Sequence, residues 1–400
     1  MREIKYVRWQ RSATAPANDF GVEQAQRAQA FHRTFPEYGV TPLARLQGLA
    51  RFLGVRNILV KDESQRFGLN AFKVLGGSYA VGCEIARRLN VPVEELNYEL
   101  LASPQVRERL GRLTFVTATD GNHGRGVAWT AQRLGQKAVV FMPKGSSAER
   151  LQNIRSLEAE ATITDVNYDD AVRLARAYAE RHGGIVVQDT SWDGYEEIPR
   201  HIMQGYTTLA YEIAQQLQAL GDVRPTHVFL QAGVGALAGA VTGFFADYYR
   251  ENLPKIIIVE PLNAACLHKT AQAADGELHK VGGALASIMA GLCCGEPCSL
   301  GWRQLAAYAD AFVAVPDEVT ALGMRVLGNP MGGDERIIAG ESGAVGVGLG
   351  AAALREEKLA WLKRDFALDG DSVILCVSTE GATDLATYRK IMWEGAWSWR

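Results

Sequence analysis

The chain has 400 residues, which is too long for one small hydrophobic core and predicts two or three domains. Hydrophobic residues make up 48% of it and charged residues 22%, as in ordinary globular proteins, and the formal net charge is -3. A balance this close to neutral supplies no positive field for nucleic acid or for an anionic membrane surface, so neither is expected as a partner.

The N-terminal stretch and one apolar run are the candidates for targeting or membrane insertion. Residues 1–5 have the sequence MREIK and lack the apolar core of a signal peptide, so we expect a cytoplasmic protein. The uncharged run 228–246 approaches the length of a membrane span, but it contains Gln231 and four glycines. We interpret it as a buried strand, a tight turn and a buried helix.

Hydrophobic periodicity predicts the elements in the first part of the chain. Helices are predicted at 22–31, 46–53 and 75–89, and a strand at 57–61. The segment 91–106 is variable and polar, so we expect it at the surface.

From residue 113 onward, apolar strand patterns alternate with helical patterns. The predicted strands are 113–118, 137–142, 161–164, 185–187, 227–230, 256–260 and 372–377, and the predicted helices are 122–134, 148–157, 168–182, 198–220 and 236–250. Such alternation predicts an α/β protein with parallel sheets and helices on both faces. In these sheets ligands bind beyond the carboxyl ends of the strands.

The four strands between about 113 and 190 are expected to form one sheet, and the strands before and after them a second sheet. The predicted domains are therefore a large one, 1–82 with 206–400, and a small inserted one, 83–205. A cleft is expected between the two.

The six cysteines are expected to be free thiols, because the chain has no secretory signal. Cys293, Cys294 and Cys298 do not have CxxC spacing and have no histidine nearby in the sequence, so we expect no metal. A bridge from Cys266 to Cys293 or Cys294 remains open.

One lysine stands between bulky apolar residues and is followed by two glycines. Lys73 lies among Phe72, Val74 and Leu75. Poorly solvated surroundings make a lysine amine more easily neutral and nucleophilic, as a Schiff-base lysine requires. The alternative is a lysine at the start of an amphipathic helix, with its stem packed and its ammonium in water.

A glycine-rich segment, QAGVGALAG at 231–239, follows an apolar strand and opens a helix. Glycines let the backbone approach an anion, and free N–H groups at the helix start bind it. Because there is neither a GxGxxG nor a Walker lysine, a single phosphate is favoured over a dinucleotide or ATP. The alternative is a tight strand-to-helix turn that binds nothing.

A third segment, TATDGNHG at 117–124, also joins a strand end to a helix start. Asp120 has two interpretations, a functional carboxylate or the N-cap of the helix. Asn122 is well placed to donate to a ligand oxygen from the helix start. His123 is more readily explained as structural than as catalytic.

The fourth segment, QDTSWDGYEEIP at 188–199, again follows a predicted strand. Aromatic residues interleaved with carboxylates suit a lid that recognises a cationic substrate. The alternative is an acidic surface loop with Trp192 and Tyr195 packed beneath it.

Together these segments resemble the fold-type II pyridoxal-phosphate enzymes, which include threonine and serine dehydratases and the tryptophan synthase β chain. Residues 41–43 match the early Thr-Pro-Leu of that family, and 71–73 match its Ser-Phe-Lys with Ala in place of Ser. Residues 119–123 match its Ser-Ser-Gly-Asn-His with Asp120 in place of the second Ser. The sequences GESGA at 340–344 and STEG at 378–381 stand where the family has its late motifs. The resemblance implies two three-layer αβα domains with parallel-rich sheets.

The departures from the general pattern resemble the diaminopropionate ammonia-lyase branch of this family. They are Asp120 itself and the segments 189–196, 202–206 and 289–292. The resemblance covers about 40 to 385. This branch implies a homodimeric carbon–nitrogen lyase that converts 2,3-diaminopropionate, in both L and D forms, to pyruvate and two ammonia.

The family carries roles onto matching positions of this sequence. Lys73 is expected to bind pyridoxal 5'-phosphate covalently, and Asn122 to hydrogen-bond the ring 3'-oxygen. A hydroxyl of Ser378 or Thr379 is expected to face the pyridine nitrogen. The backbone amides expected to hold the phosphate in the large domain are those of Gly233, Val234, Gly235, Ala236 and Leu237.

The chemistry follows from these roles. A hydroxyl beside the ring nitrogen, unlike a carboxylate, does not keep that nitrogen protonated, so the cofactor is a moderate electron sink. Loss of a β leaving group then competes well with transamination. Asp120 and Asp189 favour a cationic substrate, and a raised pKa in one of them would let it protonate the leaving amine. Lys73 and Asp120 are expected to be the bases for the L and D isomers. The alternative function is a serine or threonine dehydratase of the same fold.

Overall fold

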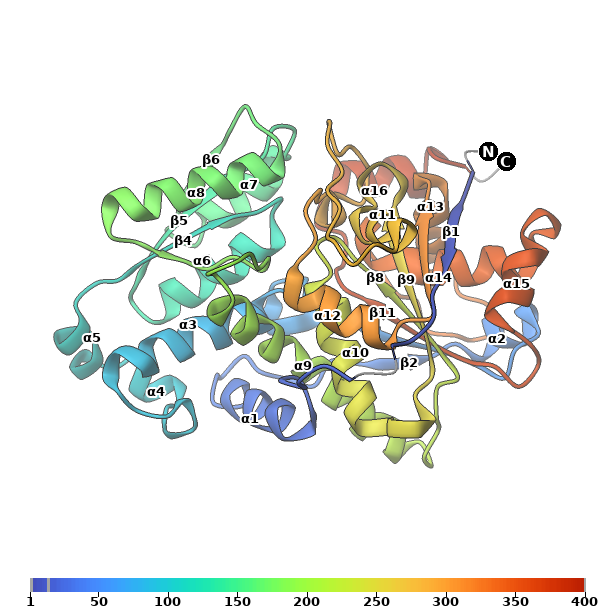
Figure 1. Ribbon diagram of the computed structural model, residues 1–400, viewed down its shortest axis with the longest axis horizontal. Coiled ribbons are helices and arrows are strands. Elements are labelled where there is room, and N and C mark those ends of the chain that lie inside the picture. Colours follow the sequence, from blue (N-terminus) through green and yellow to red (C-terminus); the bar gives the residue numbers. More distant parts are fainter. Residues whose placement is uncertain (1–2, 13–14, 399–400) are drawn as a thin grey trace.

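The computed structural model describes residues 3–12 and 15–398, which fold around two sheets (Figure 1). In spatial order, the larger sheet contains β1 (Lys5–Arg8), β10 (Ala311–Val315), β9 (Lys255–Pro261), β8 (His227–Gln231), β11 (Val373–Ser378), β3 (Asn57–Asp62) and β2 (Leu43–Arg45). The smaller sheet contains β6 (Glu160–Ile163), β5 (Lys137–Met142), β4 (Thr114–Ala118) and β7 (Ile185–Val186). Neighbouring strands are parallel, apart from the antiparallel pairs β1–β10 and β2–β3 at the two edges of the larger sheet. The predicted α/β class with parallel-rich sheets is confirmed, as is the single sheet formed by the strands from about 113 to 190.

Helices connect and cover these strands. They are α1 (Val22–His32), α2 (Gln47–Leu53), α3 (Val74–Leu89), α4 (Tyr98–Leu101), α5 (Pro104–Leu110), α6 (Asn122–Arg133), α7 (Ala148–Arg155), α8 (Tyr168–His182), α9 (Glu197–Ala219), α10 (Ala236–Tyr249), α11 (Cys266–Ala273), α12 (Ser299–Tyr308), α13 (Asp317–Gly328), α14 (Glu341–Arg355), α15 (Ala360–Phe366) and α16 (Leu385–Met392). Short 3-10 helices are η1 (Glu63–Gly68), η2 (Val93–Glu95), η3 (Arg250–Asn252), η4 (Leu262–Ala264), η5 (Ala290–Leu292) and η6 (Glu357–Leu359).

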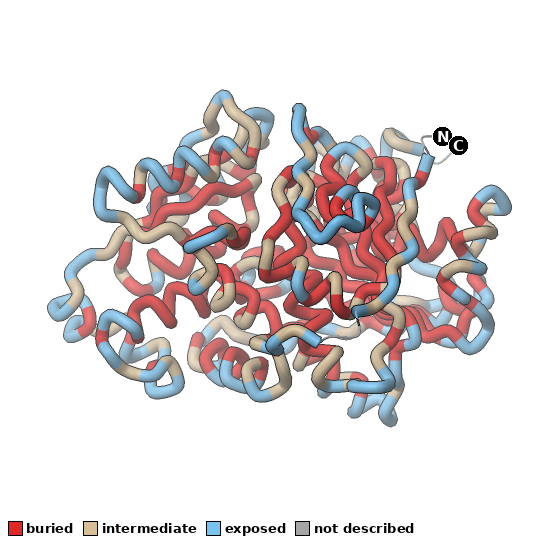
Figure 2. Tube along the Cα trace, viewed as in Figure 1, coloured by how far each residue is buried: buried red, intermediate tan, exposed pale blue. Residues whose placement is uncertain are grey.

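The central strands of the larger sheet have continuous apolar sequences because helices cover both of their faces. Every residue of β8, β10 and β11 is buried, and Figure 2 shows burial concentrated along the sheets and the helices that flank them. One hydrophobic cluster runs from Phe115 of the smaller sheet through α3, α6 and α9 to Val228 and Leu375 of the larger sheet. A second cluster fills the opposite face of the larger sheet.

Some sequence predictions were incomplete. The strands β1, β2 and β10 were missed, and two of them are short edge strands of three or four residues. The segment 91–106 lies mostly at the surface, as expected, although it forms η2, α4 and the start of α5 and buries Leu96, Leu101 and Val106. All six cysteines are free thiols, so the bridge that the sequence left open is not formed.

Glycines let three helices approach closely around the start of α3. A Cβ on Gly76 would lie 2.5 Å from a ring carbon of Tyr206 in α9, and one on Gly205 would overlap the carbonyl oxygen of Leu75. A Cβ on Gly126 of α6 would lie 2.8 Å from the Cα of Val74. The close packing of α6 and α9 on α3 therefore depends on these glycines, and it fixes the position of the residue that precedes the helix.

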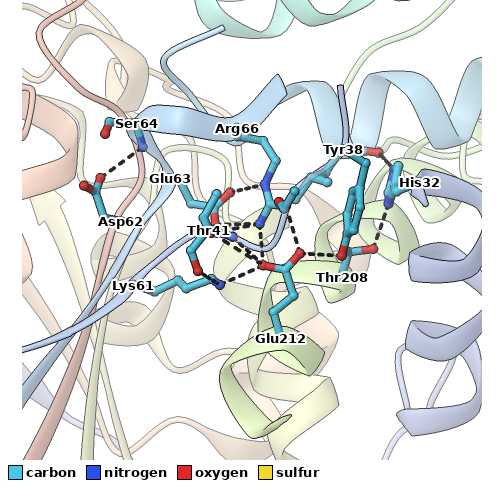
Figure 3. Close-up of polar contacts among 12 residues, drawn as sticks. His32, Tyr38, Thr41, Lys61, Asp62, Glu63, Ser64, Arg66, Thr208 and Glu212 are labelled. Carbon is cyan, nitrogen blue, oxygen red and sulfur yellow. Dashed lines mark hydrogen bonds and ion pairs between the residues drawn. The ribbon is translucent and has the colours of Figure 1, made fainter. Parts of the chain in front are cut away.

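A buried network of charges ties η1, β3 and α9 together (Figure 3). Glu212 of α9 accepts from Lys61 Nζ at 2.7 Å and from both terminal nitrogens of Arg66 at 2.7 and 2.8 Å. Arg66 also donates to Glu63 at 2.8 Å, and the side chains of these four residues are fully buried. Burial alone raises the pKa of Glu212, but Arg66 and Lys61 reverse the shift and keep it ionised. Two cations and two carboxylates thus balance each other beneath the segment that leads to α3.

We predict that Glu212→Gln destabilises the protein by about 3–5 kcal/mol, because it leaves two buried cations facing one carboxylate. A urea unfolding midpoint measures the loss. Glu180→Gln is the control, since Glu180 pairs with Arg176 at the exposed surface and its loss should cost less than about 0.5 kcal/mol. Equal midpoints for the two variants would contradict the prediction.

Candidate active site

One cavity lies where strands of both sheets end, as parallel sheets favour. It encloses about 670 Å³, part of it open to solvent, which suits a small ligand. Its walls come from segments that follow β3, β4, β7, β8 and β11. The lining residues are Phe72, Lys73, Thr119, Asp120, Asn122, His123, Tyr168, Asp189, Gln231, Ala232, Gly233, Val234, Gly235, Ala236, Leu237, Gly291, Leu292, Cys294, Ser342, Thr379 and Glu380. The structure therefore gathers every site residue expected from the sequence except Ser378.

Lys73 is the residue immediately before α3, and its ammonium forms an ion pair with Asp189. The Lys73 side chain is 18% exposed and that of Asp189 only 2%. The hydroxyls of Tyr168 and Tyr206 also approach the Asp189 carboxylate, at 3.4 and 3.5 Å. The ring of Phe72 lies 5.6 Å from the Lys73 nitrogen. The lysine is therefore enclosed by one charge and several aromatic groups.

The ion pair changes the expected charge state of both partners. Burial alone lowers the pKa of Lys73, but the Asp189 carboxylate more than offsets it and the net shift is upward. Burial alone raises the pKa of Asp189, but the Lys73 ammonium reverses this and the net shift is downward. The expectation of a readily neutral Lys73 amine is therefore wrong for this arrangement, and so is the hypothesis of a raised pKa at Asp189. The sequence did not place a carboxylate against the lysine.

The glycine-rich segment after β8 forms a narrow cradle at the start of α10. Gly235 precedes the helix with φ of +96°, a conformation that favours glycine. A Cβ on Gly233 would lie 3.2 Å from both Cys294 Sγ and Leu292 Cα. The first N–H groups of a helix have no partner within it, so this turn offers donors to an anion.

The segment after β4 places a carboxylate and an amide at the cavity. Gly121, with φ of +155°, is the N-cap of α6, so the interpretation of Asp120 as the cap is wrong. Asp120 Oδ2 lies 3.8 Å from the buried Arg150 guanidinium. Asn122 donates to the carboxylate of Glu380, which the sequence prediction did not include. His123 is buried with Nε2 2.8 Å from the carbonyl oxygen of Val187, as a structural histidine would be.

The segment after β7 contributes one side chain to the cavity wall, and its two aromatic side chains pack against each other. Asp189 lines the cavity, whereas Trp192 and Tyr195 stack on each other with ring centroids 4.2 Å apart. Neither aromatic ring is part of the cavity wall. The positions of these two rings therefore fit the alternative of a packed surface loop better than the alternative of a recognition lid.

The structure separates the two late-motif hydroxyls. Ser378 is fully buried, lies 3.5 Å from the carbonyl oxygen of Glu380 and is not part of the wall. Thr379 lines the cavity and accepts from Gln231 Nε2 at 3.0 Å. Thr379 is thus the hydroxyl that a ligand in the cavity can reach.

Sequence reasoning missed several residues of the wall. Tyr168, Gly291, Cys294 and Ser342 line it but were not among the predicted site residues. Gly291 and Ser342 lie within segments 289–292 and 340–344, which carry the resemblance, so these segments could have indicated both residues. Tyr168 and Cys294 carried no such indication, because their approach to the cavity depends on how α8 and the loop after η5 pack.

Three observations test whether this cavity fits a phosphorylated aldehyde cofactor. The glycine cradle supplies amide donors for a phosphate, and a side chain at Gly233 would crowd it. Lys73 supplies the primary amine. Ser342 Oγ and His123 Nδ1 are buried at the wall without hydrogen-bond partners among the described residues. The residues present fit such a group.

This fold, with a lysine and a glycine cradle lining the same cavity, defines a pyridoxal-phosphate-dependent enzyme of fold type II. Residues 34–379 match the family described as pyridoxal-phosphate dependent enzyme. Diaminopropionate ammonia-lyase of Escherichia coli K12 is 52% identical over 377 residues, covering 94% of this chain and 93% of that protein. The chain belongs to the diaminopropionate ammonia-lyase family of pyridoxal-phosphate-dependent enzymes.

Solved structures agree with this assignment. The holo crystal structure of diaminopropionate ammonia lyase from Escherichia coli superposes with a TM-score of 0.93 at 48% identity, covering 99% of this chain and 98% of that one. Threonine deaminase isoform 2 from Solanum lycopersicum superposes with a TM-score of 0.70 at 21% identity, covering 96% and 92% of the two chains, and shares the fold. The cofactor of this chain is accordingly pyridoxal phosphate.

We predict that Asp189→Asn makes Lys73 more reactive in the protein stripped of its cofactor. Without the carboxylate, burial dominates and lowers the pKa of the amine, so more of it is neutral at pH 8. Because the neutral fraction of the amine rises about tenfold when its pKa falls by one, we expect acylation of Lys73, followed by peptide mapping, to be at least about tenfold faster. Asp193→Asn, in the exposed part of the same loop, is the control. Equal labelling rates in Asp189→Asn and the parent protein would contradict the role of the ion pair.

Proposed function

We propose that this protein catalyses the α,β-elimination of 2,3-diaminopropionate, in both L and D forms, to pyruvate and two molecules of ammonia. One water is consumed, so the atoms of the diamino acid and water equal those of the products. The observation that carries the proposal is the pair of carboxylates, Asp120 and Asp189, in the cavity that also holds Lys73. The 52% identity to Escherichia coli diaminopropionate ammonia-lyase supports it.

Bound pyridoxal phosphate supplies an electron sink that acidifies the Cα proton of the amino acid. Lys73 is proposed to hold the cofactor covalently and, once released, to take the Cα proton of the L isomer. Asp120, which reaches the wall from the segment after β4, is proposed to take that proton from the D isomer. This two-base scheme requires Lys73 and Asp120 to reach the bound amino acid from opposite faces.

The remaining wall residues have proposed binding roles. Asp189, which stays ionised beside a cation, attracts the second ammonium group of the substrate and disfavours serine or threonine. The amides of 233–237 are proposed to hold the phosphate, and Asn122 the ring 3'-oxygen. Thr379 rather than Ser378 is proposed to face the ring nitrogen, because only Thr379 lines the cavity.

The cellular and assembly context is also proposed. We infer a cytoplasmic homodimer, supported by the resemblance to the diaminopropionate ammonia-lyase family. Within the described ranges, no helix is both long and apolar enough to cross a membrane. We further propose the division into 1–82 with 206–400 and the inserted 83–205, supported by the sequence position of the smaller sheet.

We predict that Asp120→Asn lowers kcat for D-2,3-diaminopropionate by about 10²–10⁴-fold, the usual cost of losing a general base, and spares the L isomer. Keto acid release measures both isomers, with serine and threonine assayed in parallel. Asp189→Ala, by contrast, should impair both isomers. Equal losses for L and D in Asp120→Asn would contradict the two-base scheme, and faster turnover of serine than of diaminopropionate would favour a dehydratase.

A further inference from the structure

Gln231 is a buried glutamine at the end of β8 with no role in the function described so far. Its side chain is at the wall of the cavity, and the residue is only 2% exposed. The amide nitrogen lies 2.8 Å from the carbonyl oxygen of Val377, 3.0 Å from that of Ser342 and 3.0 Å from Thr379 Oγ1. It therefore connects the glycine cradle with both late motifs.

These contacts fix the orientation of the amide. Two of the three neighbouring atoms are backbone carbonyl oxygens, which only accept hydrogen bonds. The amide nitrogen must face them, because the amide oxygen there would meet two other oxygens. The opposite end, Gln231 Oε1, has no hydrogen-bond partner among the described residues. The amide nitrogen has two protons to share among the three oxygens and does not accept hydrogen bonds, so Thr379 accepts from Gln231 and cannot donate to it.

The direction of this bond determines what Thr379 can offer a ligand. A threonine hydroxyl has one proton and two lone pairs, and here a lone pair is used by Gln231. Its proton has no acceptor among the described residues, and the side chain lines the cavity. The hydroxyl is left as a donor toward whatever the cavity binds.

We propose that Gln231 is a positioning residue that fixes the Thr379 hydroxyl as a hydrogen-bond donor to the ring nitrogen of pyridoxal phosphate. The proposal rests on the proposed function at one point, the assignment of the ring nitrogen as the cofactor atom that Thr379 faces. A donor at that position holds the ring nitrogen in its unprotonated form. Because a glutamine amide does not titrate, the arrangement is independent of pH over the working range. It keeps the cofactor a moderate electron sink and favours prompt loss of the β-amine.

The test uses the holoenzyme loaded with ¹⁵N-labelled pyridoxal phosphate, whose ring nitrogen has different NMR shifts when protonated and unprotonated. The parent enzyme should show the unprotonated shift. The Gln231 amide shares two protons among three oxygens, whereas in Gln231→Glu the isosteric carboxyl carries at most one proton, for which the two backbone carbonyl oxygens compete. Thr379 should then turn its proton toward residue 231, present lone pairs to the cavity and move the nitrogen to the protonated shift.

Two further variants separate positioning from general damage. Gln304→Glu is the matched control, because Gln304 is also buried with an unpartnered Oε1 but lies outside the cavity wall, and it should keep the parent shift. Thr379→Ser retains the hydroxyl and should also keep the parent shift.

Two results would overturn the proposal. One is a protonated ring nitrogen in the parent enzyme, which needs no variant and decides the matter even if Gln231→Glu does not fold. The other is a folded, cofactor-loaded Gln231→Glu whose shift equals that of the parent. Absence of diaminopropionate turnover alongside the expected shifts would refute the proposed substrate and leave the role of Gln231 standing.

Discussion

The ion pair between Lys73 and Asp189 is the interaction on which the site depends. Lys73 lies in the segment that follows β3 of the larger sheet, and Asp189 follows β7 of the smaller sheet. The ion pair therefore links the two sheets at the carboxyl ends of their strands. Asp189 is buried and Lys73 largely so, and an unpaired buried charge is costly, so each partner holds the other in its ionised form.

Packing beneath the site keeps the lysine in place. Gly76 and Gly205 let α3 and α9 meet backbone to backbone, and the charges around Glu212 attach η1 to α9 just before the lysine segment. One hydrophobic cluster then continues through these helices into both sheets. The cofactor cradle and the lysine thus line one cavity from the same packed unit, which favours fixed distances between them.

Much of this architecture could be predicted from the sequence. Strongly periodic segments after residue 113 gave elements within a few residues of those observed, and the four site segments meet because each follows a strand of a parallel sheet. The edge strands β1 and β2 were too short to leave a pattern. The charge of Lys73 could not be predicted because it is set by Asp189, 116 residues away along the chain. The choice between Ser378 and Thr379 likewise needed the backbone, since neighbouring residues at the end of a strand point in different directions.

Every role given to the cavity requires that Lys73 carries pyridoxal phosphate through a carbon–nitrogen double bond. Borohydride reduction of the purified holoenzyme, followed by peptide mapping, detects this bond and locates it in the chain. We expect a yellow protein that is bleached on reduction and a phosphopyridoxyl group on Lys73. A stable adduct on another lysine, or a colourless protein that takes up no label after incubation with the cofactor, would contradict the assignment.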